Sequence, residues 1–467
     1  MSSTSTTLTR DASGEQAPRL WSSRFAFVLA ATGSAVGLGN IWKFPYITGE
    51  NGGGAFVLVY LLCIALIGLP IMMAEVMIGR RGGHNPITTM KNLAAKAGIS
   101  ARWQGLGWLG VVGSFIILSF YSVIGGWAVS YVGTSATGTF AGADADAVGA
   151  LFGNLLGSPS TLLLWHTLFM ALVMVVVARG VRAGLEKATT WLMPALFVLL
   201  LMLVGYAFTT DSFGQGVSFL FSPDFSKLST EGVLTAMGHA FFTLSLGMGV
   251  MMVYGAYLPK QVSIAKVSIA VSLMDTLVAL LAGLAIFPIV FANGLEPGAG
   301  PGLIFQTLPL AFGQMPGGTL FGTLFFVLLV FAAWTSAISL LEPVVSWVEE
   351  NKGISRVTST LVAGAAIWTM GLLTILSLNE WSGFHPLGMF ATFEGKTIFD
   401  LLDYLTANIM LPLGGLLVAL FAGWALRRDS VQDELGMGDS AMFRIWYGLL
   451  RYVTPIGVLV VFVYNLI

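Results

Sequence analysis

The chain has 467 residues, of which 56% are hydrophobic and only 10% charged; its formal net charge is −1 and Cys63 is its single cysteine. Soluble domains usually carry about 25% charged residues, so this chain lacks the charge to cover a soluble surface of its size. One cysteine excludes a disulfide scaffold, and the balanced charge gives no indication of nucleic-acid binding. Because the apolar runs extend beyond about 18 residues and do not alternate, we expect an all-α polytopic membrane protein.

Eleven apolar segments of roughly 20 residues are predicted to cross the membrane. They lie near 24–49, 54–79, 105–132, 161–178, 188–209, 233–257, 263–291, 320–348, 357–378, 401–424 and 445–466. With a cytoplasmic N-terminus, 19 of the 22 Lys and Arg residues fall on the cytoplasmic side; Lys43, Lys227 and Lys396 fall outside. This distribution follows the positive-inside rule and would be lost if a span were missed. The C-terminus is therefore expected outside.

The segments between the spans are short. Residues 1–20 form a Ser/Thr-rich tail, expected in the cytoplasm, without the apolar core of a signal peptide. The longest outer loops, around 133–160, 293–319 and 379–400, are expected to hold only short helices. We therefore expect the function to lie within the membrane.

Two spans contain residues that interrupt a helix. The first contains Gly33, Gly37, Gly39 and Asn40, and the sixth contains Thr-Leu-Ser-Leu-Gly-Met-Gly at 243–249. Glycine in a membrane helix often serves close packing, and for Gly33 and Gly37 alone both interpretations stay open. Gly-x-Gly followed by Asn is different, since each glycine costs about 1 kcal/mol inside a helix. Unwound backbone at this depth is tolerated where it lines a cavity or is buried in protein.

The two interruptions lie five spans apart. This spacing predicts a 5+5 inverted repeat, with unwound helices 1 and 6 and a binding site near the membrane midplane. The expected divisions are 21–210 for the first repeat, 211–426 for the second, and 427–467 for helix 11 with its preceding loop. At such breaks, free N–H groups suit an anionic substrate group and free carbonyls suit a cation.

Long motifs surround these breaks. Residues 33–46 read Gly-Ser-Ala-Val-Gly-Leu-Gly-Asn-Ile-Trp-Lys-Phe-Pro-Tyr, and residues 51–56 read Asn-Gly-Gly-Gly-Ala-Phe. These stretches resemble the signature of the neurotransmitter:sodium symporter family, and residues 241–249 resemble its sixth helix. The resemblance covers almost the whole chain and is closest to the shorter bacterial members, which lack a twelfth helix. It implies a transporter of the bacterial cytoplasmic (inner) membrane, monomeric or weakly homo-oligomeric, that imports amino acids with sodium by alternating access.

The same resemblance implies two sodium sites. The first would use the Ala35 carbonyl, Asn40, Thr243, Asp275 and the carboxylate of the bound substrate. The second would use the carbonyls of Gly33, Val36 and Ala332 with the hydroxyls of Thr335 and Ser336. By residue type alone, Thr335 and Ser336 would bond back to their own helix. Their Ala-Ala-Trp-Thr-Ser context, which matches the family's eighth helix, favours sodium binding.

Asp275 lies in the middle of an apolar span, where a carboxylate is costly and indicates a functional site. The alternative is a protonated Asp bonded to a neighbouring helix. The family usually has Asn here, and its animal members bind chloride through a Ser one turn onward, where this sequence has Ala279. We expect Asp275 to supply the negative charge itself, so that transport needs no chloride. It could also take up a proton on the return step.

The resemblance also implies a substrate site. Its residues are Ala35, Leu38, Gly39, Ile117, Tyr121, Phe242, Ser245, Met248, Ser336 and Leu340. Backbone N–H groups of Leu38 and Gly39, with the Tyr121 hydroxyl, would bind an α-carboxylate. Carbonyls near Phe242 and Ser245 would bind the α-ammonium. Ala35 stands where amine transporters carry an Asp, and the wall is apolar, so we expect large aliphatic or aromatic L-amino acids.

Two gates are implied in the same way. Lys43 and Asp403 would close the outer side, with Phe242 and Tyr121 as the lid, and Arg19, Trp21, Tyr257 and Glu350 would close the inner side. Without the resemblance, Lys43 could equally extend to the lipid headgroups. Glu75 and Glu342 are expected to bond to neighbouring helices. His239 is expected to be a hydrogen-bonding residue of the outer vestibule.

Two alternatives to sodium-coupled transport stay open. A proton-coupled amino acid permease of the same architecture is the nearer one, although the oxygen-bearing Asn40, Thr335 and Ser336 argue against it. A sensor that binds amino acids without transporting them is the second. The sequence has no nucleophile–base set or metal motif, so we do not expect an enzyme. It also has no phosphate-binding Gly-Lys-Ser/Thr loop, so ATP is not expected to drive transport.

Overall fold

The computed structural model describes residues 20–297 and 302–464, and these residues form helices and connecting turns without a β-strand. Nearly all of the predicted N-terminal tail, including Arg19 of the predicted inner gate, lies outside the described residues. The all-helical membrane architecture expected from the composition is confirmed.

The first half of the chain contains several long helices separated by short ones. In chain order they are α1 (Arg24–Ala35), η1 (Gly39–Lys43), α2 (Phe44–Glu50), α3 (Gly54–Cys63), η2 (Ile64–Gly68), α4 (Leu69–Gly82), α5 (Pro86–Lys96), η3 (Ala101–Trp103), α6 (Gln104–Ala136), α7 (Ala145–Leu156), α8 (Pro159–Ala178), η4 (Val181–Glu186) and α9 (Lys187–Phe208).

The second half of the chain has the same mixture of long and short helices. In chain order they are α10 (Phe213–Phe221), η5 (Phe225–Lys227), α11 (Thr230–Thr243), α12 (Val250–Ala256), α13 (Ile264–Ala292), η6 (Leu303–Thr307), α14 (Leu308–Gln314), α15 (Gly318–Lys352), α16 (Arg356–Ser377), η7 (Ala391–Phe393), α17 (Ile398–Tyr404), η8 (Leu405–Met410), α18 (Leu411–Leu420), η9 (Phe421–Ala425), α19 (Arg428–Leu435), α20 (Ala441–Gly448), η10 (Leu449–Val453) and α21 (Thr454–Tyr464).

Within the described residues, nine continuous helical stretches are long and apolar enough to cross a membrane. A tenth candidate is α1 with η1 and α2, which are bent against each other by 49°. The segments α11 and α12 are each shorter than a span. The count of eleven spans and the inverted repeat remain predictions.

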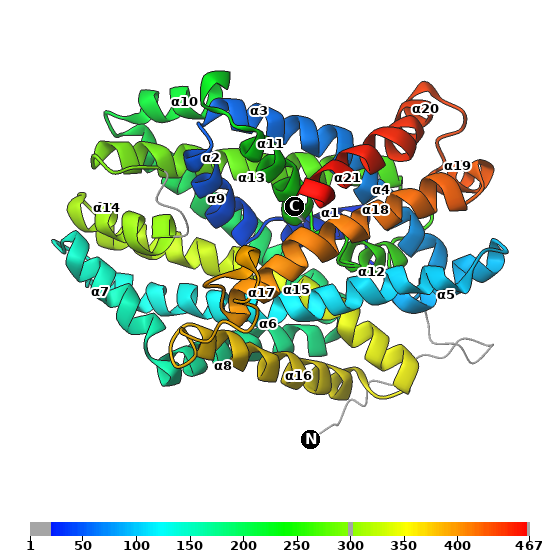
Figure 1. Cartoon of the computed structure of the whole chain (residues 1–467), viewed down its shortest axis with the longest axis horizontal. Coiled ribbons are helices and arrows are strands. Elements are labelled where there is room, and N and C mark those ends of the chain that lie inside the picture. Colours follow the sequence, from blue (N-terminus) through cyan, green and yellow to red (C-terminus); the bar gives the residue numbers. More distant parts are fainter. Residues whose placement is uncertain (1–19, 298–301, 465–467) are drawn as a thin grey trace.

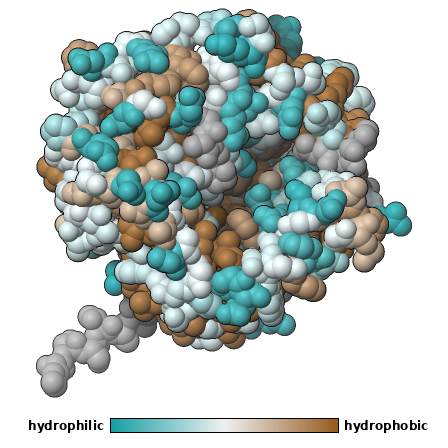
Figure 2. Space-filling model, turned by 60° about the vertical axis from the view of Figure 1, so that its left-hand side comes forward, coloured by the Kyte–Doolittle hydropathy of each residue, from teal (hydrophilic) through white to brown (hydrophobic). Residues whose placement is uncertain are grey.

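The long helices run between two ends of the molecule (Figure 1). Short helices α7, α10 and α14 lie at one end, and α5, α19 and α20 lie at the other. The loops 133–160 and 293–319 thus hold short helices, as expected. Figure 2 shows the end that carries α7, α10 and α14, which is hollowed near its centre.

The first and sixth predicted spans are both interrupted. Helix α1 ends at Ala35, and Val36 has extended backbone with φ −70° and ψ 108° before η1 begins at Gly39. Helix α11 ends at Thr243 and α12 begins at Val250. The predicted interruption of helices 1 and 6 is therefore confirmed.

The break between α11 and α12 requires backbone conformations with positive φ, which few residue types adopt. Ser245, Gly247 and Gly249 have φ of 53°, 78° and 73°. A Cβ at Gly247 would lie 2.6 Å from the Leu411 carbonyl oxygen, so only glycine fits. The loop thus has a defined conformation, and its exposed backbone groups need partners from other helices.

Two buried side chains supply partners to this loop. The Glu75 carboxylate of α4 accepts a hydrogen bond from the Gly247 backbone N–H at 2.6 Å. The Ser114 hydroxyl of α6 donates to the Met248 carbonyl at 2.8 Å. Glu75 therefore bonds to a neighbouring helix region, as predicted. These contacts satisfy backbone groups that the break releases from helical hydrogen bonding.

Candidate substrate and sodium site

The two interrupted spans meet at one small cavity. Nine of the ten predicted substrate residues line it, namely Ala35, Gly39, Ile117, Tyr121, Phe242, Ser245, Met248, Ser336 and Leu340. The tenth, Leu38, lies beside it, and its backbone N–H donates to the Tyr121 hydroxyl at 3.2 Å. Residues that are far apart in the sequence therefore line one cavity, and they are those that the family resemblance implies.

Ser34 and Gly37 also line the cavity but were not among the predicted residues. A Cβ at Gly37 would lie only 2.4 Å from the Ser336 hydroxyl oxygen and 2.9 Å from that of Tyr121. Glycine is therefore required for α15 and α6 to approach the first break. The Gly-x-Gly pattern was the signal in the sequence, although packing alone could not be separated from a site.

The cavity has a polar and an apolar side. Backbone of the first break and the hydroxyls of Tyr121, Ser245 and Ser336 form the polar side, where the Ser245 hydroxyl donates to the Ser34 carbonyl at 3.0 Å. Ile117, Met248 and Leu340 contribute apolar side chains. Such a cavity suits a small molecule with a polar head and an apolar side chain.

Three of the four predicted residues of the first sodium site bond to one another. The Asn40 amide donates to the Asp275 carboxylate at 2.8 Å and to the Asp275 backbone carbonyl at 3.0 Å. The Thr243 hydroxyl lies 3.1 Å from both carboxylate oxygens. Asp275 is completely buried, with 0% exposure. The fourth residue, Ala35, lines the adjoining cavity.

The second predicted sodium site also comes together. The Ser336 hydroxyl lies 3.4, 3.1 and 3.2 Å from the carbonyl oxygens of Gly33, Ser34 and Val36. The Thr335 hydroxyl lies 3.1 Å from the Ala332 carbonyl and 3.0 Å from that of Phe331. Thr335 thus makes the backbone contact expected of a helical Thr, within the predicted oxygen cluster.

Both clusters fit sodium by their donor atoms. They contain carbonyl, hydroxyl and carboxylate oxygens, which are the ligands that hard cations take, whereas the Asn40 amide oxygen accepts a hydrogen bond from the Gly37 backbone N–H at 3.0 Å. Carbonyls released by broken membrane helices are suited to this role. Asn40, Thr243, Asp275, Thr335 and Ser336 are the side chains that would hold the two ions.

At the outer side, the predicted Lys43–Asp403 ion pair is not formed. The Lys43 ammonium lies instead over the Phe242 ring, 4.8 Å from its centre. A cation can be stabilised by the face of an aromatic ring in this way. Lys43 and Phe242 also line a second hollow, which shares Phe242 with the cavity and includes Glu231, His239 and other residues. The role of Lys43 and Asp403 as a gate stays a prediction.

His239 lines the hollow beside Lys43, as expected of a vestibule residue, but it forms no hydrogen bond with a described protein group. Neither ring nitrogen has a hydrogen-bond partner among the described residues. The imidazole is buried and packs against Phe44 and Tyr60, with ring centres 6.0 and 5.4 Å apart. It therefore acts as an aromatic packing residue in this structure.

Of the predicted inner-gate residues, Trp21 packs against the end of α12. Its backbone N–H donates to the Tyr257 carbonyl at 3.0 Å, and its indole N–H donates to the Tyr254 carbonyl at 3.1 Å. The indole is 1% exposed and makes edge contacts with both tyrosine rings. Two predicted inner-gate residues, Trp21 and Tyr257, are therefore in direct contact.

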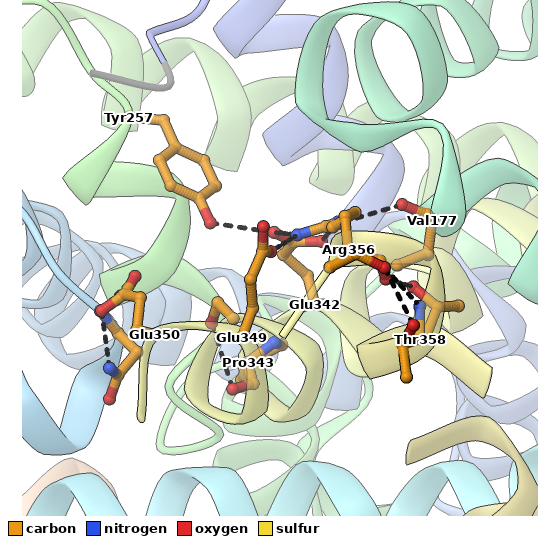
Figure 3. Close-up of polar contacts among 12 residues, drawn as sticks. Val177, Tyr257, Glu342, Pro343, Glu349, Glu350, Arg356 and Thr358 are labelled. Carbon is orange, nitrogen blue, oxygen red and sulfur yellow. Dashed lines mark hydrogen bonds and ion pairs between the residues drawn. The ribbon is translucent and has the colours of Figure 1, made fainter. Parts of the chain in front are cut away.

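Tyr257 also joins a polar cluster that the sequence did not reveal (Figure 3). Its hydroxyl donates to the Glu342 carboxylate at 2.9 Å. The Arg356 guanidinium pairs with the same carboxylate, contacts Glu349 at 3.5 Å and donates to the Val177 carbonyl at 3.0 Å. Glu342 was expected to bond to a neighbouring helix, and the structure shows an ion pair with the first residue of α16.

Glu350 points away from this cluster toward the start of α5 (Figure 3). Its carboxylate accepts hydrogen bonds from the Asn85 backbone N–H at 3.0 Å and the Asn85 amide at 2.7 Å. The His84 ring nitrogen lies 3.6 Å from it. Within the described residues, Glu350 thus fixes the loop between α4 and α5. Arg19, the other charged residue of the predicted inner gate, lies outside them.

A multi-pass helical protein with two broken spans around a buried cavity has the architecture of a membrane transporter. The chain belongs to the sodium:neurotransmitter symporter family, whose model matches residues 19–148 and 155–467. It is therefore a sodium-dependent symporter for a small molecule and not an enzyme, as the sequence predicted.

Individual relatives agree with this assignment. An uncharacterized sodium-dependent transporter of Bacillus subtilis, YhdH, is 41% identical over 456 residues, which cover 97% of this chain and 98% of the relative. An uncharacterized sodium-dependent transporter of Haemophilus influenzae is 34% identical over 96% of this chain and 98% of its own length. The crystal structure of MhsT in complex with L-phenylalanine matches with a TM-score of 0.87 and 42% identity, covering 96% of this chain and 99% of that chain.

Proposed function

We propose that this symporter imports large aliphatic and aromatic L-amino acids with sodium across a bacterial cytoplasmic membrane. The observation that carries the proposal is the cavity in which nine predicted substrate residues meet beside two oxygen clusters. MhsT, which is 42% identical, was crystallised with L-phenylalanine, a member of the same substrate class.

The substrate would be held by both of its charged ends. Its carboxylate would lie near the Leu38 and Gly39 N–H groups, the Tyr121 hydroxyl and the first sodium ion. Its ammonium would face carbonyls of the second break near Phe242 and Ser245. Because Ala35 supplies no carboxylate, the substrate carboxylate completes the first sodium site. Ile117, Met248 and Leu340 would surround the apolar side chain.

The two sodium ions would link substrate binding to conformational change. The first would join Asn40, Thr243, Asp275 and the substrate. The second would join the first break to α15 through Thr335, Ser336 and the carbonyls of Gly33, Val36 and Ala332. Binding of both ions would hold the broken helices against α15, the outer gate at Lys43 and Asp403 would close, and the inner gate would then open.

Asp275 would make transport independent of chloride. Its carboxylate lies against Asn40 and Thr243 and is completely buried. A sodium ion brought to this position is neutralised by the carboxylate, so that a second anion is not required. The same group is the candidate for proton uptake once sodium leaves.

The test is uptake of radiolabelled L-leucine and L-phenylalanine into proteoliposomes under a Na⁺, Li⁺ or H⁺ gradient. We expect accumulation only with Na⁺, and equal rates in chloride and gluconate. Equal uptake under a proton gradient without Na⁺ would instead identify a proton-coupled permease. Binding without accumulation would identify a sensor, and loss of uptake on chloride removal would contradict the role of Asp275.

A further inference from the structure

A groove separate from the substrate cavity lies between α8, the segment η4–α9 and α15; we call it the α8–α9 groove. Its volume is about 260 Å³. Its apolar lining comes from Val176, Ala188, Trp191, Leu192 and Trp334. Trp191 is 74% exposed, so the groove has a large aromatic ring on an open side.

Two cationic residues, Arg179 and Lys187, also line this groove. Arg179 directly follows α8 and Lys187 begins α9, so both lie at the ends of membrane-spanning helices. Neither side chain forms an ion pair or hydrogen bond with any residue in the ranges 20–297 and 302–464. An apolar groove therefore carries two positive charges at its end, and no anion within the described part of the chain pairs with them.

The neighbouring charged residues are engaged elsewhere. Glu186, which precedes Lys187, accepts hydrogen bonds from the backbone N–H and hydroxyl of Ser22. The Arg182 guanidinium donates to the Leu20 carbonyl at 2.9 Å. The loop between α8 and α9 thus binds the N-terminal segment with one set of residues. Arg179 and Lys187 are left to face the groove.

We propose that the α8–α9 groove binds an anionic phospholipid of the cytoplasmic leaflet. Its phosphate would lie between Arg179 and Lys187, and one acyl chain would lie along Trp191, Leu192 and Trp334. A basic pocket between membrane helices on the cytoplasmic side attracts anionic headgroups. The positive-inside distribution places this loop on that side, and tryptophan favours the headgroup level of the membrane.

The helices that line this groove also contact Gly33 of the second proposed sodium site. The groove residues Ala188 and Trp334 are followed in sequence by Thr189 and Thr335. These two, with Met193, surround Gly33: a Cβ there would lie 3.3 Å from Thr189 Cγ2, 3.3 Å from Thr335 Cβ and 3.1 Å from Met193 Sδ. The side-chain layer of Thr189, Met193 and Thr335 therefore packs against Gly33, and two of its members directly follow groove residues in the sequence.

Occupation of the groove would hold this layer against Gly33 and so raise the sodium affinity. This effect rests on the proposed second sodium site, whereas lipid binding itself does not. The two parts are therefore measured separately, with the full chain in both cases.

Lipid binding is tested by native mass spectrometry of the detergent-purified protein titrated with phosphatidylglycerol, phosphatidylcholine or inorganic phosphate. The test variant is R179Q/K187Q, and the matched control is K91Q/K96Q, which removes two exposed charges from α5. The charge-preserving variant R179K/K187R separates loss of charge from loss of folding. We expect the wild type to retain phosphatidylglycerol and R179Q/K187Q to bind it about tenfold more weakly. K91Q/K96Q and R179K/K187R should bind it as the wild type does.

Equal retention of phosphatidylglycerol by R179Q/K187Q and the wild type would overturn the site. Equal retention of phosphatidylcholine would show that the charges do not select the lipid and would also overturn it. Full competition by inorganic phosphate at equal concentration would mean that a free anion, and not a lipid, is the ligand. A loss that R179K/K187R shares would assign the effect to folding instead of charge.

The effect on sodium is tested by equilibrium ²²Na⁺ binding in nanodiscs of phosphatidylcholine with and without phosphatidylglycerol. We expect about fivefold tighter sodium binding with phosphatidylglycerol for the wild type and no gain for R179Q/K187Q. An unchanged affinity alongside confirmed lipid binding would overturn the coupling but leave the lipid site. Absence of sodium binding in both membranes would contradict the proposed sodium sites while the mass-spectrometric result still decides the lipid site.

Discussion

The Arg356 guanidinium forms an ion pair with the Glu342 carboxylate, with Nη1 2.9 Å from Oε1. The Tyr257 hydroxyl donates to the same oxygen, also at 2.9 Å. Glu342 belongs to α15 and Arg356 is the first residue of α16. Tyr257 follows α12, the helix that starts after the second break. Arg356, Glu342 and Tyr257 together therefore connect the end of α12 to α15 and α16 (Figure 3).

Replacing Arg356 should destabilise the protein strongly. Glu342 is 0% exposed, and removal of one partner from a buried ion pair costs about 3–5 kcal/mol because a buried charge is left unpaired. We expect R356Q to lower the thermal unfolding midpoint of the detergent-solubilised protein, and R356Q/E342Q to recover part of the loss.

The control for this prediction is R428Q. Arg428 pairs with Asp439 at 2.7 Å, but both side chains are about half exposed, and such pairs contribute about 0–1 kcal/mol. Similar losses in R356Q and R428Q would show that the buried pair has no special role.

Ser336 is expected to carry part of the second sodium site. Its hydroxyl lies within 3.4 Å of three carbonyl oxygens of the first break. S336A removes one oxygen ligand without adding bulk, so we expect sodium affinity to fall about tenfold, in line with about 1–3 kcal/mol for a buried polar group that loses its partner. The measurement is the sodium dependence of amino acid uptake.

Ser346 provides a matched control on the same helix. It is also buried, and its hydroxyl donates to the Pro343 carbonyl at 3.1 Å, within α15. S346A should leave the sodium dependence unchanged. If S336A and S346A shift it equally, the effect comes from helix packing and the proposed site is wrong.

Asp275 is expected to replace chloride as the negative charge of the site. D275N keeps the size of the side chain and removes its charge, so sodium affinity should fall in any anion. Ala279 lies one turn further along α13 and is buried. D275N/A279S should therefore recover part of the uptake in chloride but not in gluconate. Equal recovery of uptake by D275N/A279S in chloride and in gluconate would show that Asp275 does not act through its negative charge.

The residues that the sequence located best are those whose chemistry is costly in a membrane. Asp275 and the residues of the second break, Ser245 and Gly247, stand out because a buried charge and a lost helix hydrogen bond both require compensation. Their meeting around one cavity follows from the pairing of two broken spans. The other residues of the two sodium sites and the substrate site were implied by the resemblance to the symporter family, and their roles as ligands remain predictions.

The partners of long charged side chains were harder to predict. Lys43 could reach Asp403, the headgroups or a ring, and only packing places it over Phe242. Arg356 begins a helix at the membrane surface, where an arginine is expected to be exposed, yet it pairs with buried Glu342. Such contacts depend on how helix ends approach in space, and the sequence gives no period or motif for that.

Met248 is expected to set the size of the accepted side chain. It lines the cavity from the second break, and none of the lining residues is charged. Its flexible thioether can adapt to different substrates. The phenylalanine ring is broader and more rigid than the methionine side chain. M248F should therefore exclude aromatic substrates more strongly than aliphatic ones. We expect the ratio of kcat/KM for L-phenylalanine to that for L-leucine to fall about tenfold, because a change of one or two carbon groups in an apolar pocket is worth about 1–3 kcal/mol. Competition uptake with both labelled substrates measures this ratio directly, and M389F, at an 80% exposed position, is the control. An unchanged ratio in M248F would place the substrate side chain against another wall of the cavity.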